Sequence, residues 1–400
     1  MDSERLLVGV PRETFPGETR VALAPTVLPS LMKAGMDIVI ETEAGTRAGF
    51  PDDAYTKHDA RIASRREVFE QADIVTQVRT CSANPDAGRG DLELMRPNQV
   101  IVGFAEPLSY PTAVAEVAQR NVTAFAMEFM PRISRAQSMD ALSSQATATG
   151  YKAVIMAAER LPKMFPMLTT AAGTVPPAQV FVIGAGVAGL MAIATARRLG
   201  AVVQAYDVRA AAQEDIESLG ARAVLLPLEP GDAEDASGYA RELGPEFYRR
   251  QQELMAQVVA GVDVVITTAL IPGKQAPMLI TAEAVAGMQH GAVIVDTAAE
   301  RGGNCELTSP DSPVVTENGV TIFGPTNLPA TVPYEASQMY AKNITAFLLH
   351  LVKDGKLVID REEEIVKGCL VTQGGEIVHT RVTQSLADSG LAEVEHDEQA

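Results

Sequence analysis

The segment VFVIGAGVAGL, residues 180–190, holds three glycines at the spacing G-x-G-x-x-G: Gly184, Gly186 and Gly189. An apolar run typical of a buried strand precedes them, and a helix-like pattern follows. In such a turn the first glycine permits a sharp bend, the second lets backbone N–H groups approach a pyrophosphate, and the third lets the helix pack on the strand. The start of the helix then faces the phosphates. The segment therefore predicts a dinucleotide site, and a turn without ligand is the weaker alternative.

Asp207 ends the next predicted strand, at about the 20-residue distance from the glycines where a ribose-binding acid is expected. Its carboxylate would accept hydrogen bonds from the ribose hydroxyls and repel a 2′-phosphate, which favours NAD over NADP. Arg209 could pair with a phosphate, but beside Asp207 we expect an exposed arginine near the adenine. The expected cofactor contacts here are Gly184, Ala185, Gly186, Val187, Gly189, Asp207, Val208 and Arg209.

Two further segments, TTALIPGKQAP (267–277) and VDTAAERGGNCE (295–306), each begin at the end of a predicted strand. The carboxyl ends of parallel strands line the nucleotide crevice of such sheets. The expected contacts with the ribose and nicotinamide are Thr268, Ala269 and Leu270. Cys305 has no basic neighbour in sequence, so we expect a buried structural cysteine rather than a reactive thiol.

The segment MPRISRAQSMDALSSQ, residues 130–145, gathers arginines, a glutamine, an aspartate and serines between an apolar run and a predicted helix over 144–161. One interpretation is a hinge and helix cap, in which a serine or Asp140 satisfies free N–H groups. Capping leaves Arg132 and Gln137 unexplained. A functional loop is therefore the favoured interpretation.

Short apolar runs alternate with helical stretches along the chain, which predicts an α/β protein with two Rossmann-like, doubly wound parallel-sheet domains and a cleft between them. The expected first-domain strands are 6–10, 37–42, 73–78, 99–105 and 122–128, with helices 26–35, 54–63 and 111–120. The expected second-domain strands are 180–186, 201–207, 221–228, 262–269, 292–299 and 319–324. The expected domains are 1–143 with 330–385, then 144–329, followed by an acidic tail at 386–400.

Composition excludes several classes of function. The net charge of −18 argues against nucleic acid and against an anionic membrane surface as direct partners. Three scattered cysteines and five scattered histidines give no metal-ligand pattern, so we expect no metal. Residues 164–196 carry no charge, but their prolines and glycines predict buried soluble structure rather than a membrane span. No signal peptide is expected.

Together these segments resemble one family. VGVPRETFPGETRVALAP, residues 8–25, is similar to the signature shared by alanine dehydrogenase and the NAD(H)-binding component (alpha subunit, domain I) of proton-translocating NAD(P) transhydrogenase. The polar segment 130–145 closely resembles a loop of the transhydrogenase component, and SGYARE, 237–242, resembles its mobile loop. TTALIPGK, GGNC and TNLPATVPYEASQMYAKN also match, so the resemblance covers about residues 5–380.

The resemblance implies a homodimer that holds NAD(H) and docks on an NADP(H)-binding component and membrane proton-channel subunits. It implies a cytoplasmic location, peripheral on the inner face of the cell membrane, and direct Re/Si-specific hydride transfer coupled to proton translocation. The implied catalytic residues are Arg132, Gln137, Asp140, Ser143 and Tyr239, with cofactor contacts also from Ser138, Met139 and Gly238.

The resemblance also assigns roles within the loop. Arg132 would hold the pyrophosphate or nicotinamide-ribose side of NAD, and Gln137 would bond the ribose and reach toward the partner's nucleotide. Asp140 and Ser143 would fix the carboxamide. Hydride transfer between two nicotinamides needs alignment and no proton donor or acceptor, which suits such a loop.

Two alternatives stay open. Alanine dehydrogenase uses an arginine, a lysine and a histidine, and the corresponding positions here are Arg20, Arg79 and, near the third, Glu106. Without a histidine acid/base, reductive amination is poorly supported, and Arg20 is better interpreted as structural. The second alternative is a non-catalytic, NAD-binding regulatory subunit.

Overall fold

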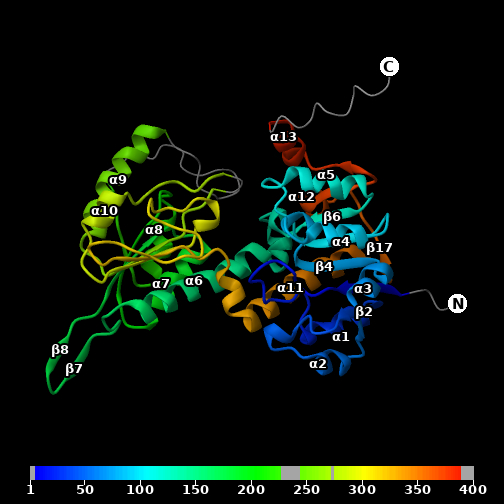
Figure 1. Ribbon diagram of the computed structural model, residues 1–400, viewed down its shortest axis with the longest axis horizontal. Helices are drawn as coiled ribbons and strands as arrows, with labels where there is room; N and C mark the ends of the chain where they lie inside the picture. Colours follow the sequence, from blue (N-terminus) through cyan, green and yellow to red (C-terminus); the bar gives the residue numbers. More distant parts are fainter. Residues whose placement is uncertain (1–4, 227–243, 272–273, 389–400) are drawn as a thin grey trace. The chain divides into compact units, whose positions relative to one another are not determined.

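The structure is a computed structural model that describes residues 5–226, 244–271 and 274–388. The chain divides into two compact units (Figure 1). Unit 1 runs to Gln145 and resumes at Ala330, and unit 2 is Ala146–Pro329. The chain therefore leaves unit 1 once and returns to complete it.

Unit 1 is built on an eight-stranded sheet in the order β19-β18-β6-β5-β4-β1-β2-β3. The strands from β3 to β6 pair in parallel, whereas β18 is antiparallel to β6 and β19 to β18. The C-terminal segment thus adds an antiparallel edge to a parallel sheet. The strands are β1 Leu6–Val10, β2 Met36–Glu41, β3 Arg61–Ala63, β4 Ile74–Arg79, β5 Val100–Phe104, β6 Thr123–Ala126, β18 Leu370–Gln373 and β19 Glu376–Ile377.

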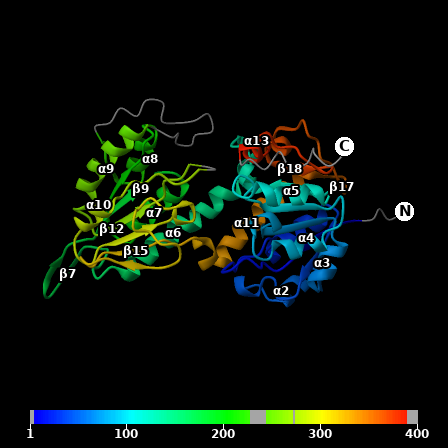
Figure 2. The ribbon, with the colours of Figure 1, turned by 45° about the horizontal axis from the view of Figure 1, so that its top comes forward.

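Helices cover both faces of this sheet. One buried cluster joins β1, β2, β4, β5 and β6 to α1 (Leu28–Lys33), α11 (Pro333–Leu351) and α12 (Glu364–Cys369). Another joins β4, β5 and β6 to α3 (Arg65–Gln71) and α5 (Pro111–Gln119), and α5 lies beside β18 (Figure 2). The remaining helices of the unit are α2 (Asp52–Thr56), α4 (Gly88–Leu94) and α13 (Thr380–Asp388).

Unit 2 is built on a seven-stranded sheet in the order β11-β10-β9-β12-β13-β15-β14, parallel except at the edge strand β14. After β9 the chain adds strands on one side and then crosses to add β12 on the other. Such a switch point is where open α/β sheets bind ligands, outside the carboxyl ends of the strands. The strands are β9 Gln179–Ile183, β10 Val202–Tyr206, β11 Arg222–Ala223, β12 Val264–Thr267, β13 Val293–Asp296, β14 Val314–Val315 and β15 Thr321–Phe323.

The second sheet is also covered on both faces. Helices α6 (Ala141–Arg160), α7 (Val187–Arg198) and α8 (Ala212–Ser218) share one core cluster with the strands. Helices α9 (Pro245–Val259) and α10 (Ala282–Ala286) share another. Both units therefore have the doubly wound α/β architecture that the alternation of strands and helices predicts, and this prediction is confirmed.

The expected helix over 54–63 is wrong in its second half. Helix α2 ends at Thr56, and the chain turns through Asp59, whose φ of 59° lies in the left-handed region. Residues 61–63 then form the edge strand β3, in which Ile62 pairs with Ile40. Pairing with β2 outweighs the local helical pattern here, because a strand's partner lies outside the sequence window.

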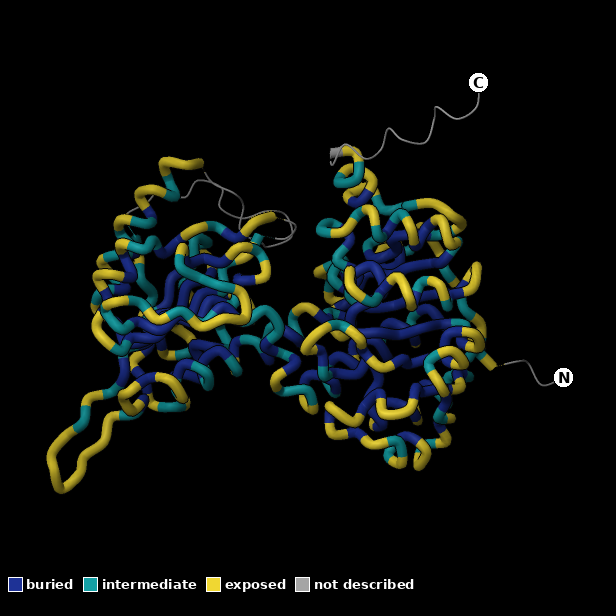
Figure 3. Tube along the Cα trace, in the orientation of Figure 1, coloured by how far each residue is buried: buried dark blue, intermediate teal, exposed yellow. Residues whose placement is uncertain are grey.

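The expectation of buried structure over residues 164–196 is wrong for residues 167–174, which are exposed. Strands β7 (Leu168–Thr170) and β8 (Gly173–Val175) form a hairpin whose residues are exposed, apart from the half-buried Val175 (Figure 3). Among the described strands, these two pair with each other alone. Within the described part of the chain, no helix is both long and apolar enough to cross a bilayer.

The last helix reaches slightly further than expected. Helix α13 ends at Asp388, so its final residues fall within the region 386–400 expected to be an acidic tail. The rest of that region lies outside the described residues. The expected strand 221–228 is only two residues long, at β11, and its end also lies outside the described residues.

Helix α11 joins the C-terminal part of unit 1 to the N-terminal sheet through an aromatic pair. Phe347 meets Phe125 of β6 edge-on, with ring centroids 5.2 Å apart, and both side chains are fully buried. We expect Phe347→Ala to lower the free energy of unfolding of unit 1 by about 3–5 kcal/mol, through lost burial and the cavity left behind. Calorimetric or denaturant unfolding measures the change.

The control lies on the same helix. Leu349 is 40% exposed, so Leu349→Ala should change stability by no more than about 0.5 kcal/mol. Equal losses from the two variants would show that α11 is not anchored through Phe347.

Candidate functional site

The glycine turn after β9 is shaped by close packing at two of its three glycines. Gly184 has φ of 94°, and a Cβ there would lie 2.7 Å from the Thr268 Oγ1. A Cβ at Gly189 would lie 1.8 Å from the Gly184 carbonyl oxygen. At Gly186, however, a Cβ would meet no atom within 4 Å. Packing therefore requires the outer two glycines, whereas the open space at the middle one suits the approach of a ligand.

Asp207 lies at the end of β10 and is bonded to the glycine turn. Its Oδ2 accepts from the Ala185 N–H at 2.7 Å. Arg209 donates to the same carboxylate from its backbone N–H (2.9 Å), Nε (2.9 Å) and Nη2 (3.0 Å). The Arg209 side chain is only 19% exposed, so the expectation that it is exposed is wrong. The reason is local, because a carboxylate two residues away accepts the guanidinium in a bidentate pair.

The segment after β12 contacts the same turn. Thr268 donates its N–H to the Ile183 carbonyl at 2.8 Å and its hydroxyl to the Gly184 carbonyl at 3.2 Å. Leu270 is 43% exposed. The structure thus brings together the glycine turn, Asp207 and Thr268 at the carboxyl edge of one sheet, as residues in parallel strands allow. Among the other predicted contacts, Val187 is exposed and Val208 is half-buried.

A buried carboxylate that the sequence did not single out organises this edge. Asp296 ends β13 and has no exposed surface. It accepts hydrogen bonds from the Thr267 and Thr308 hydroxyls and from the N–H groups of Ala298, Asn304 and Cys305. In the sequence, the two glycines of GGNC are the feature that could have indicated a tightly packed turn against this carboxylate. Both glycines have positive φ, and a Cβ at Gly303 would lie 2.7 Å from the Asp296 carboxylate.

Cys305 is buried within this arrangement, as expected. Burial raises the pKa of its thiol to about 11, and only the thiolate is a strong nucleophile. Its backbone N–H donates to the Asp296 carboxylate at 3.0 Å.

The polar loop of unit 1 forms a short 3₁₀ helix, Ser134–Met139. Its buried side chains and helix α11 hold it in place. Ala136 and Met139 are buried in the core of the unit. Asn343 of α11 donates to the Ser138 carbonyl at 2.9 Å and accepts from the Ser144 hydroxyl at 2.6 Å. In the same loop, the side chains of Arg132, Gln137 and Ser138 are exposed to solvent.

Asp140 caps helix α6. Its carboxylate accepts from the Ser143 N–H at 2.9 Å and from the Ser143 hydroxyl at 2.6 Å, and α6 begins at Ala141 rather than at 144. The capping interpretation therefore applies to Asp140 and Ser143. It does not account for Arg132 and Gln137, which precede the cap. Gly238 and Tyr239, expected on a second loop, lie outside the described residues.

Comparison with known proteins shows which family the chain belongs to. The model of the Alanine dehydrogenase/PNT N-terminal domain matches residues 9–149, and that of the Alanine dehydrogenase/PNT C-terminal domain matches residues 153–380. The chain belongs to the alanine dehydrogenase/PNT family. The first part of the NAD(P) transhydrogenase alpha subunit of Rhodospirillum rubrum is 47% identical to it over 380 residues, which cover 94% of this chain and 98% of the relative.

Solved structures of the family agree. Transhydrogenase from Sinorhizobium meliloti is 40% identical, with a TM-score of 0.81 over 94% of this chain and 99% of that chain. L-alanine dehydrogenase is 26% identical, with a TM-score of 0.79 over 96% and 99%. Within the family, the chain therefore groups with the transhydrogenase alpha subunits.

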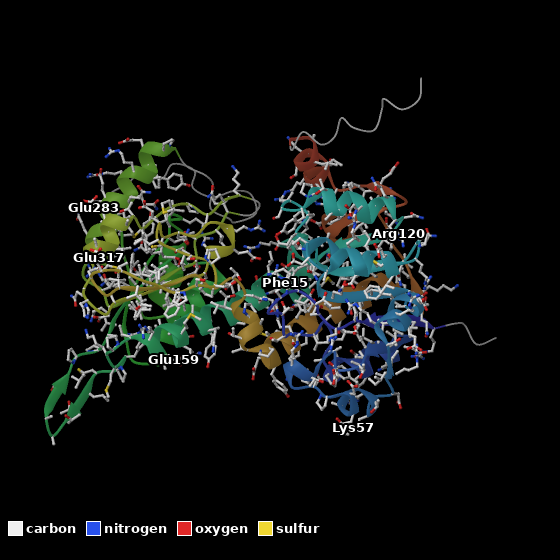
Figure 4. The ribbon with its side chains drawn as sticks, viewed as in Figure 1. Phe15, Lys57, Arg120, Glu159, Glu283 and Glu317 are labelled. Carbon is white, nitrogen blue, oxygen red and sulfur yellow. The ribbon has the colours of Figure 1, made fainter. Side chains whose placement is uncertain are left out.

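The sequence resemblance matches Arg20, Arg79 and, approximately, Glu106 to the residues that alanine dehydrogenase uses, and Arg20 and Arg79 contact neighbouring side chains of unit 1. Arg20 is buried and pairs with both carboxylate oxygens of Glu18, at 2.8 and 2.6 Å, while its Nη1 donates to Gln145 at 2.8 Å. Arg79 lies with its guanidinium 4.1 Å from the ring centre of Phe15, in the segment that follows β1 (Figure 4). Glu106 has φ of 48° and follows β5.

Glu13 lies beside this cluster. It accepts from the N–H groups of Val78 (2.6 Å) and Arg79 (3.2 Å). Burial, and then the neighbouring charge of Glu18, raise the pKa of Glu13 to about 8. The Glu13 carboxyl is therefore mostly protonated at neutral pH.

The raised pKa of Glu13 predicts a pH dependence of stability. Between pH 4.5 and about 8, the unfolded chain loses this proton while the folded chain keeps it. The contribution of Glu13 to the free energy of unfolding should therefore be largest below pH 4.5. Between pH 4.5 and about 8 this contribution should fall, by at most about 1.4 kcal/mol per pH unit. In Glu13→Gln this component is absent, and the melting temperature should depend less on pH.

A matched variant is Glu362→Gln, whose side chain is 88% exposed in the same unit. Its melting profile should follow the wild type. An unchanged slope in Glu13→Gln would contradict the assignment of a buried, protonated Glu13.

Proposed function

We propose that this chain is the NAD(H)-binding alpha subunit of a proton-translocating, Re/Si-specific NAD(P) transhydrogenase. In this proposal, hydride passes directly between NADH on this chain and NADP⁺ on a partner component. The observation that carries it is the anchored loop of unit 1. Its polar residues Arg132 and Gln137 are exposed, while Asn343, Ala136 and Met139 fix its base.

Unit 2 would hold the nucleotide. The open space at Gly186 would admit the pyrophosphate next to the first turn of α7, where backbone N–H groups favour an anion. The Asp207 carboxylate, oriented by Ala185 and Arg209, would accept the ribose hydroxyls. Its charge beside a 2′-phosphate is unfavourable, so we assign NAD(H) to this chain and NADP(H) to the partner.

The loop would act on the nicotinamide end. Arg132 would hold the pyrophosphate or the adjoining ribose, and Gln137 would bond that ribose and reach toward the partner's nucleotide. The hydrogen-bonded pair of Asp140 and Ser143 would orient the carboxamide and hence the ring. Ser138, Met139, Gly238 and Tyr239 complete the proposed set. Since no proton moves to or from either substrate, these residues need only align the rings and exclude water.

An amino-acid dehydrogenase is the rival function. It needs a free cation for the substrate carboxylate and a proton donor. The Arg20 guanidinium is already bonded to Glu18 and Gln145, which argues against substrate binding there. A regulatory subunit without hydride transfer is the second rival. Hydride exchange by the chain would exclude this function, and NADH binding without exchange would support it.

The proposed enzyme is an assembly. We infer a homodimer that docks on the NADP(H)-binding component and on membrane proton-channel subunits, at the cytoplasmic face of the cell membrane. The support is the grouping with transhydrogenase alpha subunits, which by their names form part of a larger enzyme.

One pair of assays separates the three functions. The chain is mixed with the NADP(H)-binding component of a transhydrogenase, NADPH and the acetylpyridine analogue of NAD⁺, and formation of the reduced analogue is followed by absorbance. We expect rapid exchange. A separate assay with NADH, pyruvate and ammonia should show no turnover above background. Robust amination would establish the dehydrogenase, and NADH binding without exchange would establish the regulatory subunit.

Gln137→Asn shortens an exposed side chain by one methylene and keeps its amide. We expect exchange to slow by about 10-fold or more, because alignment errors of about 1 Å are costly in such reactions, while NADH affinity changes by less than about threefold. Stopped-flow exchange and NADH fluorescence titration measure the two effects. Parallel losses of rate and affinity would count against a role in alignment.

A further inference from the structure

Asn304 is the residue of GGNC that makes the most hydrogen bonds with the proposed nucleotide edge. It has no exposed surface, and its side-chain amide is fully engaged. The Nδ2 group donates to the carbonyls of Ala269 (2.9 Å) and Pro277 (2.8 Å), and the Oδ1 accepts from the Ala269 N–H (3.1 Å). One carboxamide therefore holds both backbone polar groups of Ala269 and joins them to Pro277.

The backbone of Asn304 is held as firmly as its side chain. Its own N–H donates to Asp296 at 2.7 Å, and its carbonyl accepts from the N–H groups of Leu279 and Ile280. Gly302 and Gly303, both with positive φ, turn the chain so that Asn304 enters the buried edge. Asparagine suits the position because one short planar group supplies two N–H donors and an oxygen acceptor, whereas an ionised aspartate has no donor and serine has only one.

Ala269 is connected in turn to the glycine turn. Its neighbour Thr268 bonds the carbonyls of Ile183 and Gly184. Hydrogen bonds thus run from β13, through Asn304 and the segment after β12, to the turn after β9. A shift of Ala269 would displace the backbone that carries Leu270, whereas Asp207 makes no hydrogen bond to Ala269 and is bonded to Ala185 and Arg209.

We propose that Asn304 is a positioning residue of the nucleotide site, and that its carboxamide fixes the backbone of residues 268–270 beside the nicotinamide half of NAD(H). This inference rests on the proposed function and deepens it. It assigns the adenosine half to Asp207 and the nicotinamide half to a hydrogen-bond clamp of a different strand. Loss of the clamp should therefore affect the two halves of the nucleotide unequally.

Asn318 provides a matched control in the same sheet. Its Nδ2 donates to the carbonyls of Val285 (3.1 Å), Ala286 (3.3 Å) and Met288 (3.2 Å), and its Oδ1 accepts from Thr316. It lies just before β15, at the opposite edge from the carboxyl ends of the strands. Asn318→Ala removes a similar clamp at a place where no nucleotide is proposed.

The test compares two ligands, NADH and ADP-ribose, which lacks the nicotinamide. Isothermal titration gives both affinities for the wild type, Asn304→Ala and Asn318→Ala. In Asn304→Ala we expect the ratio of NADH affinity to ADP-ribose affinity to fall about tenfold, and hydride exchange to slow at saturating NADH. Asn318→Ala should leave the ratio and the rate unchanged. Asn304→Asp, which keeps the acceptor for Ala269 and loses both donors, serves as a second variant should the first unfold.

Equal weakening of both ligands, an unchanged ratio in Asn304→Ala and Asn304→Asp, or the same loss in Asn318→Ala would overturn the assignment. Failure of the proposed function gives a different pattern: the wild type would bind NADH and ADP-ribose, the ratio would still fall in the variants, and no exchange would occur with the partner component. A wild type that binds neither ligand would overturn both proposals.

Discussion

The buried carboxylate of Asp296 imposes the constraint on which the carboxyl edge of unit 2 depends. A charge without access to water is strongly unfavourable unless hydrogen-bond donors surround it. Those donors come from the end of β12, from the turn after β13 and from the GGNC segment. Satisfying one carboxylate therefore brings three stretches of chain to defined positions, and one of them, the GGNC segment, bonds the backbone of Ala269 through Asn304.

The two units make different contributions to the proposed reaction. Unit 2 supplies the switch point, the glycine turn and Asp207, which together suit binding. Unit 1 supplies a loop whose base is fixed by buried side chains and by Asn343, while Gln137 stays exposed. In the proposed function the second substrate is another nucleotide, so no arginine is needed for an amino-acid carboxylate, which is consistent with the pairing of Arg20 with Glu18.

The sequence predicted those features that depend on local pattern. Apolar strand runs, the glycine spacing and the acid after the second strand indicated the doubly wound architecture and the order of its parts. It did not predict features that depend on distant partners. Strand β3 exists because Ile62 pairs with Ile40, and the roles of Asp296 and Asn304 require knowing which strand ends are neighbours. The expectation of an exposed Arg209 is wrong because its guanidinium pairs with Asp207 instead of extending into solvent.

Direct transfer between the two nicotinamides is the central claim, and isotope transfer tests it most directly. NADH carrying deuterium at the transferable position of the ring is mixed with this chain, the NADP(H)-binding component and NADP⁺, and the NADPH formed is analysed by mass spectrometry. We expect the deuterium to be retained in NADPH, because direct transfer gives it no opportunity to exchange with water. NADPH formed without deuterium, or no NADPH at all, would contradict direct transfer.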